Sequence, residues 1–428
     1  MGKHFFSGIR QNVNTIVKKN IKKDFSVIFA TFSPWENNRR SPTNGMVEPM
    51  VAFFAPRTKK FVLIDQPHPG SDRLIPTIEI YENGKHKKTT KSSLIVSWLY
   101  PLLVLNNTLK TSVAFKIRDF LSVLDFTLRN HYNYDLFIGL ESINTLAGVL
   151  LKKIGLVKKV VYYVSDFSLQ RYRSPFLNKI YLFLDRMAFN HADFVWDVSR
   201  AMMSARRTAG LSTKITKVPI YVPIALFSSQ VGSRKPIKTI PASLVYAGAL
   251  GRENGPDLAI YALKKVLRTI PQAQLHIFTN GQDMKTQNLR DLTDRLGIHN
   301  KVLFHGLISN QTELIKDLGQ FMVGLAPYRA LTNSARWWAD ATRIRLYLAA
   351  GLPVITTQVP PVGKELEQEQ SGLVVKDNAE KIAQAIISLL KNRNLYRKMR
   401  QNAIAQARDN TWDKVYSKTL KDMGIVLT

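Results

Sequence analysis

Two arginines at the predicted start of a helix are the part of this sequence with the clearest chemistry. Asp340 can cap a helix whose first turns contain Arg343 and Arg345. The dipole and free N–H groups of a helix N-terminus favour anions, so cations at that end indicate a shared anionic partner. The alternative is a surface pair between Asp340 and Arg343, which would stabilise the helix by only a few tenths of a kcal/mol.

The residues that follow these arginines would form the supporting elements. Gly351 is expected to end the helix. Pro353 then starts a β-branched run over 354–357, which is typical of a strand buried in a parallel sheet. A phosphate-bearing ligand at the helix start would explain this order of helix, glycine stop and buried strand.

Length and composition predict a globular protein of two domains. The chain has 428 residues, 45% of them hydrophobic, which is enough for two full cores. Cysteine is absent, so disulfides and thiolate metal sites are excluded. The eight histidines show no close-spaced ligand pattern, and the sequence has no Asp-x-Asp pair for Mg²⁺ or Mn²⁺. We therefore expect neither a metal nor a cofactor.

The charge is strongly positive. The net charge is +30, with 33 Lys and Arg against 15 Asp and Glu in residues 1–217 and 28 against 16 in the remainder. Such a field attracts nucleic acid or an anionic membrane surface, and a merely solvated basic surface is the simpler alternative. Because the charge is accompanied by no recognised nucleic-acid motif, no nucleic acid is expected as a partner.

Two segments favour the membrane surface. Residues 1–23 place apolar side chains at helical spacing with lysines toward the end, which is typical of a basic amphipathic helix. This segment lacks the continuous apolar core of a signal peptide, so we expect it to be retained. The apolar run 94–105, twelve residues long, is too short to span a bilayer. With Trp98 and Tyr100 beside Pro101 it would either dip into a membrane interface or form a buried core helix.

Strands and helices alternate in two series, which predicts two parallel-sheet domains. The expected first domain is 24–227, and a polar segment rich in Ser, Lys and Pro over 228–243 is typical of a linker. The expected second domain is 244–408. The last helix, within 409–428, is expected to cross back onto the first domain.

Several motifs then carry a family resemblance. In the second half, SLVYAGALG, KVLFHG, FMVGLAPY and LYLAAGLPVI follow one another in the order and spacing of the nucleotide-sugar domain of GT-B glycosyltransferases, closest to glycosyltransferase family 4. In the first half, YDLFIGLESINTLAGVLLKKIG, VVYYVSDF and HADFVWDVSRAM resemble the acceptor domain of the same family. The resemblance covers about residues 24 to 428.

This resemblance implies a GT-B architecture, in which two Rossmann-like domains face each other across a cleft. It implies a hexosyltransferase-type enzyme that binds a nucleotide-sugar on the second domain and the acceptor mostly on the first, without a metal. Without a bound cation, arginines and helix N-termini must neutralise the nucleoside diphosphate leaving group. Arg343 falls where relatives carry a basic residue, so it is the predicted leaving-group residue.

The sequence departs from the family pattern in two places. Family members usually carry two glutamates eight residues apart in the helix region, and here the matching positions are Trp338 and Leu346. Because the second glutamate normally holds the donor ribose, nucleotide recognition must differ or be absent. The usual arginine after the first strand of this domain is replaced by Ala249. Arg252, in the glycine-bordered turn GRENG, could substitute for it or be an exposed loop cation.

The other predicted site residues lie in loops or at strand ends. Asp166 and Glu141 each end a strand, where a carboxylate could take an acceptor proton or orient the sugar, or could only cap the next helix. In the loop after the first strand, Asn44 and Gly45 could let backbone approach the diphosphate, or form an ordinary turn. Tyr328, with Arg329, Trp337 and Trp338, could line the base or sugar pocket or belong to the core. The predicted donor-binding set is Gly248, Arg252, Tyr328, Asp340, Thr342 and Arg343.

The sequence therefore predicts a glycosyltransferase that moves a sugar from a nucleotide-sugar to a glycan or lipid-linked acceptor, with retention of configuration. We expect it in the cytoplasm, peripherally bound to the anionic inner face of the membrane. The missing glutamate pair leaves a second hypothesis, a catalytically inactive protein of the same fold that binds glycan or membrane.

Overall fold

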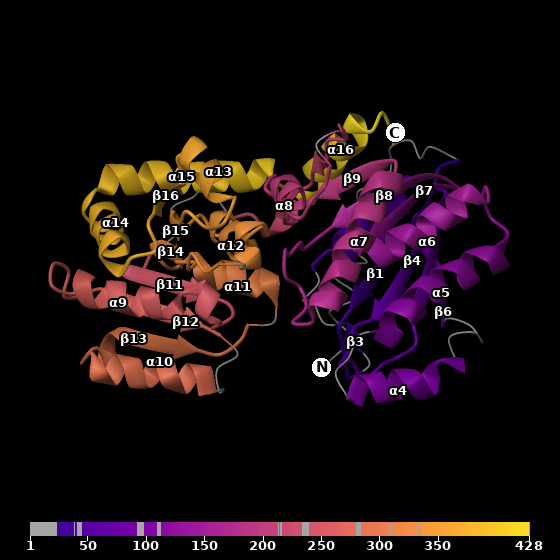
Figure 1. The fold of residues 1–428 in the computed structure, drawn as a ribbon. Coiled ribbons are helices and arrows are strands. Elements are labelled where there is room, and N and C mark those ends of the chain that lie inside the picture. Colours follow the sequence, from indigo (N-terminus) through magenta and orange to yellow (C-terminus); the bar gives the residue numbers. More distant parts are fainter. Residues whose placement is uncertain are drawn as a thin grey trace.

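The protein forms two α/β bodies, shown in Figure 1. The computed structural model describes residues 24–37, 39–40, 45–91, 98–108, 113–212, 214, 216–232, 239–279, 284–308, 310–332 and 334–427. The helix predicted for residues 1–23 and the predicted site residue Asn44 lie outside the described residues. The two bodies confirm the predicted α/β fold class.

The N-terminal body is built on an eight-stranded sheet with the order β10-β9-β8-β7-β1-β4-β5-β6. Its strands are β1 (Ser26–Ser33), β4 (Lys60–Pro67), β5 (Thr77–Glu82), β6 (Lys85–Lys91), β7 (Tyr134–Leu140), β8 (Val157–Val164), β9 (Phe194–Asp197) and β10 (Ile220–Tyr221). A separate antiparallel pair, β2 (Trp35–Glu36) and β3 (Arg39–Arg40), follows β1. The central strands β1, β4 and β7 are buried almost throughout, as their apolar sequences predict.

The far edge of this sheet differs from the all-parallel sheet that the sequence predicted. Strands β5 and β6 pair antiparallel to β4 and to each other. Asn83 and Gly84 connect them with positive φ angles of 49° and 79°, which is the turn chemistry of a tight hairpin. The β6 segment is mostly exposed and rich in lysine and threonine, which suits an edge strand.

The helices of this body are α2 (Val47–Phe54), α4 (Tyr100–Thr108), α5 (Val113–Asn130), α6 (Glu141–Lys153), α7 (Pro175–His191) and α8 (Met202–Thr208). For residues 98–105, the part of the apolar run that the structure describes, the alternative of a buried core helix is wrong. Leu103 is buried, in a small cluster with Ala114 and Phe115, but Trp98 is 86% exposed and Leu105 54% exposed. The described part of this run is therefore a surface helix that packs through Leu103 and half-buried Leu99 and leaves its other apolar side chains exposed.

The C-terminal body contains a six-stranded, all-parallel sheet with the order β13-β12-β11-β14-β15-β16. Its strands are β11 (Ser243–Ala247), β12 (Gln274–Phe278), β13 (Val302–His305), β14 (Val323–Ala326), β15 (Val354–Thr357) and β16 (Gly372–Val375). Its helices are α9 (Pro256–Val266), α10 (Met284–Arg295), α11 (Gln311–Leu318), α12 (Thr342–Ala349), α13 (Gly363–Gln368), α14 (Ala379–Lys391) and α15 (Arg393–Asp409). All four residues of β15 are buried, in agreement with its β-branched sequence.

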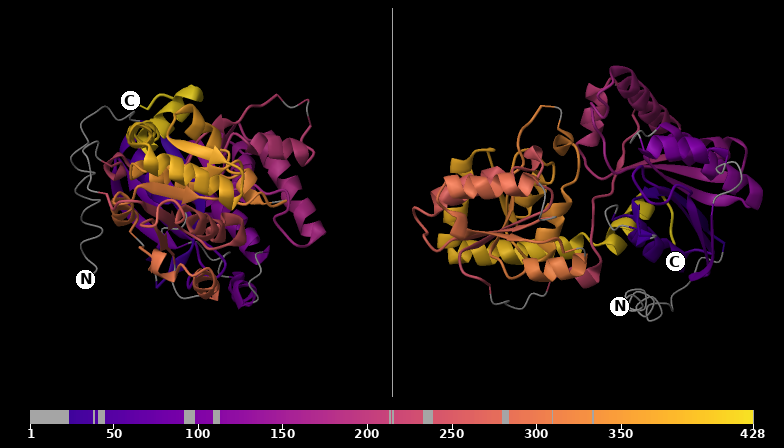
Figure 2. Two further views of the ribbon diagram at one scale, coloured as in Figure 1. Left: turned by 90° about the vertical axis from the view of Figure 1, so that its left-hand side faces the viewer. Right: turned by 90° about the horizontal axis from the view of Figure 1, so that it is seen from below.

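The last helix, α16 (Trp412–Asp422), packs in the core of the N-terminal body. Figures 1 and 2 show α15 along the C-terminal body and α16 against the N-terminal one. The chain thus passes between the bodies twice, and the two passages touch, because Asn410 donates to the Ile224 carbonyl at 2.8 Å and the Trp412 N–H to the Leu226 carbonyl at 3.0 Å.

In the described part of the chain, none of the helices has both the length and the hydropathy that a membrane span requires.

Candidate active site

Arg343 is a buried cation of the C-terminal body at the start of a helix, where an anionic ligand is favoured. It lies in the first turn of α12, and only 8% of the residue is exposed. Its guanidinium lies 4.1 Å from the ring centre of Tyr246 and 5.4 Å from that of Tyr328. Among the described residues, its Nε and Nη1 atoms have no hydrogen-bond partner. A buried guanidinium with free donors is ready to bind an anion, because it has lost water without gaining a carboxylate.

The loop after β11 is shaped around this guanidinium. Gly248 has φ +130°, and a Cβ atom added there would lie 2.9 Å from the Arg343 Nη2 atom. The carbonyl of Ala249 accepts a hydrogen bond from the same Nη2 at 3.5 Å. Arg343 therefore reaches, from helix α12, the loop position Ala249, where the family resemblance implies an arginine.

Arg252, the substitute that the sequence suggested for that arginine, is exposed on the short 3₁₀ turn Arg252–Asn254. Thr342 is exposed at the start of α12, and Tyr328 is buried beside Arg343. The structure therefore brings Gly248, Tyr328 and Arg343 together.

Asp340 and Arg345 belong to a different, internal cluster. Asp340 does not cap α12, because the helix begins at Thr342 after Ala341 and has no side-chain cap. Its carboxylate instead accepts from Arg345 Nε at 3.2 Å and from the Ile224 N–H at 2.9 Å. The surface pair with Arg343, considered as an alternative, is also wrong. Sequence spacing could not show this, because Ile224 is more than a hundred positions away.

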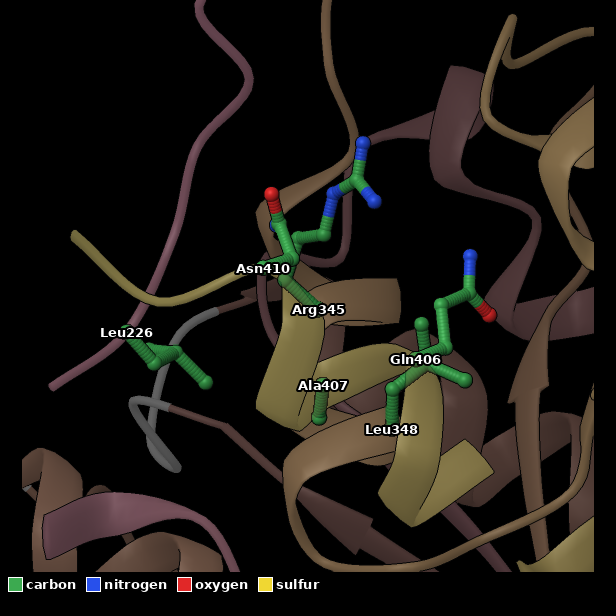
Figure 3. A pocket seen from close by; sticks show the side chains of 6 residues that line it. All are labelled: Leu226, Arg345, Leu348, Gln406, Ala407 and Asn410. Carbon is green, nitrogen blue, oxygen red and sulfur yellow. The ribbon is translucent and has the colours of Figure 1, made fainter. Parts of the chain in front are cut away.

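Arg345 completes this cluster with two further contacts. It donates to Glu365 at 2.8 Å and to the Tyr221 hydroxyl at 3.0 Å. We name Asp340, Arg345, Glu365 and Tyr221 the hinge cluster, because Tyr221 lies on a strand of the N-terminal sheet and the other three belong to the C-terminal body. Figure 3 shows the small pocket that Arg345 lines together with Leu226 and Asn410, which lie on the two passages between the bodies. The donors of Arg345 are thus engaged within the protein, whereas the Nε and Nη1 donors of Arg343 are unpaired among the described residues.

The remaining aromatics near the helix start are divided between the two bodies. Trp337 packs at the margin of the C-terminal core and donates from Nε1 to the Leu331 carbonyl at 3.0 Å. Trp338 packs against the core of the N-terminal body. Arg329 forms an ion pair with Asp257.

The N-terminal body gathers carboxylates at the carboxyl ends of β7 and β8. Glu141 is the first residue of α6 and has a φ of +64°, which is a strained conformation for a side chain of this size. It accepts hydrogen bonds from the backbone N–H of Ser165 at 3.2 Å and from its hydroxyl at 2.8 Å. Half-buried Asp166 follows, with its Oδ2 atom 3.6 Å from Arg171 Nη1. Burial raises the pKa of Glu141, and the nearby Arg171 and the Ser165 bond only partly offset this.

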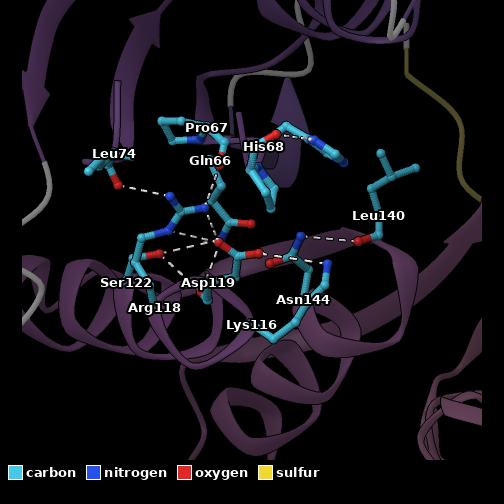
Figure 4. Close-up of polar contacts among 11 residues, drawn as sticks. Gln66, Pro67, His68, Leu74, Lys116, Arg118, Asp119, Ser122, Leu140 and Asn144 are labelled. Atoms are coloured by element: carbon cyan, nitrogen blue, oxygen red, sulfur yellow. Dashed lines mark hydrogen bonds and ion pairs between the residues drawn. The ribbon is translucent and has the colours of Figure 1, made fainter. Parts of the chain in front are cut away.

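Further polar residues, which the sequence analysis did not identify, lie at this edge of the sheet (Figure 4). Gln66 is buried and donates to the Asp119 carbonyl at 3.0 Å, and its own Oε1 has no partner among the described residues. Asn144 likewise has an unpaired Oδ1. Lys116 lies 3.9 Å from the Asp119 carboxylate and 5.3 Å from the centre of the Phe32 ring.

One of these residues could have been found from the sequence, because Gln66 sits at the end of a strand that the sequence did predict. Lys116 and Asp119 lie on the long helix α5, where no local pattern distinguishes them. Gly45, from the predicted diphosphate loop, has a φ of +58° and precedes α2.

Comparison with known proteins gives this geometry a family context. Residues 241–392 match the family model described as glycosyl transferases group 1. The resemblance to group 1 glycosyltransferases is confirmed. No curated protein matches the sequence.

Solved structures agree with the family match. Sucrose-phosphate synthase from Thermosynechococcus elongatus superposes with a TM-score of 0.65 at 15% identity, over 94% of this chain and 98% of that one. HepE from Anabaena, in complex with UDP, gives 0.62 at 13% identity over 94% and 100%. At these identities the likeness shows the GT-B fold, while the family match supports the predicted enzyme class, a glycosyltransferase.

Within the matched region 241–392, the two positions at which the resemblance implies glutamates lie on either side of Arg343 in the sequence. Trp338 precedes α12, and half-buried Leu346 lies on it at the margin of the apolar core. Neither side chain can accept a hydrogen bond from a ribose hydroxyl.

Proposed function

We propose that this protein transfers a sugar from a nucleotide-sugar donor to a glycan or lipid-linked acceptor, with retention of configuration and without a metal ion. The observation that carries the proposal is the buried guanidinium of Arg343, whose Nε and Nη1 donors have no partner among the described residues and lie beside the Gly248 loop. A diphosphate bound there would receive charge-assisted hydrogen bonds in a site shielded from water.

The proposed reaction breaks the bond between the sugar anomeric carbon and the diphosphate oxygen, and the electron pair leaves with the phosphate. Arg343 neutralises that departing charge. The acceptor hydroxyl oxygen forms the new bond to the anomeric carbon on the same face. Its proton passes to a carboxylate, and the raised pKa of Glu141 suits this residue for taking it. Asp166, next to Arg171, would orient the acceptor.

The acceptor side is supported by the unpaired oxygens of Gln66 and Asn144, because such buried acceptors suit the hydroxyl groups of a sugar. A nucleotide-sugar donor is supported by a solved structure of similar fold, because HepE has been crystallised with UDP-glucose. Peripheral binding to the inner face of an anionic membrane, in the cytoplasm, is supported by the net charge of +30 and by the exposed Trp98 and Leu105.

A thermal-shift panel of nucleoside diphosphates and their sugars tests the donor site. We expect at least one nucleotide to raise the melting temperature of the wild type, since a ligand that binds the folded state stabilises it. Arg343→Ala should abolish that shift and lower turnover roughly 10²–10³-fold, while the ligand-free melting temperature stays near that of the wild type. Arg290→Ala, which removes an arginine that stacks on Phe304 instead, is the matched control. Normal turnover in Arg343→Ala would contradict the assignment.

The second candidate is a catalytically inactive protein of the same fold that binds glycan or membrane. Trp338 and Leu346, at the positions of the family glutamates, favour it. If none of the nucleotides or nucleotide-sugars shifts the melting temperature, this second function replaces the first.

A further inference from the structure

Helix α7 exposes an apolar stripe on the side of the N-terminal body. Phe176, Ile180 and Phe183 follow one another at helical spacing and are 70%, 38% and 57% exposed. We name these three residues the α7 stripe. The opposite side of the helix buries Ala188 and Phe189 in the core. Figure 2 shows α7 standing out from the body in both views.

The surroundings of the α7 stripe are cationic. Arg173, Lys179 and Arg186 are exposed on the helix or just before it. The acidic residue within α7 is Asp185, which is buried and accepts from Arg206 Nε at 3.2 Å. The outer side of α7 therefore combines aromatic and aliphatic side chains with positive charge and presents no exposed carboxylate of its own.

This combination selects one kind of occupant. A second copy of the chain is disfavoured, because each copy carries a net charge of +30 and the two stripes would be brought together with their cations. An anionic lipid surface satisfies both parts of the pattern, because the acyl boundary takes up the phenylalanines and the phosphate headgroups attract the cations. We propose that the α7 stripe docks onto an anionic membrane, with α7 lying in the plane of the headgroups.

The location of the stripe links it to the proposed acceptor site. The helix begins at Pro175, shortly after Asp166 and Arg171 in the loop that follows β8. The stripe begins in the first turn of α7, so its first residue, Phe176, is at the carboxyl edge of the sheet, where Glu141 also lies. This inference rests on the proposed function, to which it adds that the acceptor is presented at a lipid surface rather than free in solution.

Flotation of the full chain with vesicles of phosphatidylglycerol and phosphatidylethanolamine tests the docking. We expect the wild type to float with the vesicles at low salt, and the double variant Phe176→Glu/Phe183→Glu to partition at least about tenfold less, since two apolar anchors become anions. The matched control, Met284→Glu/Leu307→Glu, makes the same change at exposed positions of the C-terminal body and should float like the wild type.

The outcomes separate docking from catalysis and from folding. The conservative variant Phe176→Leu/Phe183→Leu should keep floating. The nucleotide-induced thermal shift reports the donor site in the C-terminal body and should be unchanged in all variants. The docking proposal is overturned if the wild type does not float, if the double glutamate variant floats as well as the wild type, or if the control is lost equally. If nucleotides do not raise the melting temperature of the wild type, the proposed function is contradicted. The flotation result then still tests the docking proposal by itself.

Discussion

At the scale of single residues, a buried polar side chain without a hydrogen-bond partner marks a functional candidate, whereas a buried and fully paired one marks a structural residue. Arg343 and Arg345 are two positions apart and both are buried, yet Arg345 donates to Asp340, Glu365 and Tyr221, whereas Arg343 keeps two open nitrogens. The free energy lost in burying such a group is recovered only when a ligand binds. Glu141 combines a strained φ angle with desolvation that raises its pKa, and both features mark it as a functional rather than a structural residue.

Glu141 gives a prediction in which stability and activity move in opposite directions. Because burial raises its pKa above the unfolded value, the group favours folding at pH values below the ordinary glutamate pKa, and this contribution is lost as pH rises through the folded pKa. Glu141→Gln mimics the protonated form. We therefore expect the variant to melt above the wild type at pH 8, by roughly 2–4 °C per kcal/mol gained, and to match it near pH 4.

Turnover of the same variant should fall about 10²–10⁴-fold if Glu141 takes the acceptor proton. Exposed Glu367→Gln is the control and should change neither quantity. Melting curves across pH and an assay with the nucleotide-sugar found by the thermal-shift panel measure both. If the variant is no more stable at pH 8 than the wild type, the charge of Glu141 does not destabilise the folded protein.

At the scale of elements, local patterns identified most strands and failed where long-range contacts decide. β15 is buried as its β-branched run predicts, because such a run packs well in a parallel sheet that is covered on both faces. Asp340 was expected to cap α12 but pairs with Arg345 and the backbone of Ile224, which no spacing rule can reveal. The open donors of Arg343 were equally invisible, since they depend on the close approach of the Gly248 loop.

The hinge cluster provides the prediction for this scale. Asp340 and Arg345 are ion-paired with side chains only 2% and 3% exposed, so Arg345→Met would leave a buried carboxylate without its cation. We expect a loss of about 3–5 kcal/mol in the free energy of unfolding, measured in urea. The double variant Asp340→Asn/Arg345→Met removes both charges and should recover much of the loss. A single variant as stable as the wild type would show that the pair contributes little to the link between the bodies.

At the scale of the whole molecule, the two bodies are joined by two adjacent chain passages and by a C-terminal helix that serves the other body's core. Tyr416 on α16 is fully buried, with its ring centre 5.1 Å from that of Trp412 and 5.3 Å from that of Phe53. The residues that complete the core of the N-terminal body therefore follow the whole C-terminal body in the sequence. This arrangement predicts that the stability of the N-terminal body depends on the last turns of the sequence.

Tyr416→Ala tests this dependence. Removing a buried aromatic ring leaves a cavity and should cost about 3–5 kcal/mol, confined to the N-terminal body because the contacts of Tyr416 lie there. Hydrogen exchange should show faster opening of β1 and β4 and unchanged protection of β11 and β15. Nucleotide binding, which involves Arg343 in the C-terminal body, should persist. Val426→Ala, at a position 62% exposed, is the control and should leave both bodies unchanged. If Tyr416→Ala loosens both bodies together, they unfold as one cooperative unit, and the two passages couple them more tightly than their separate cores indicate.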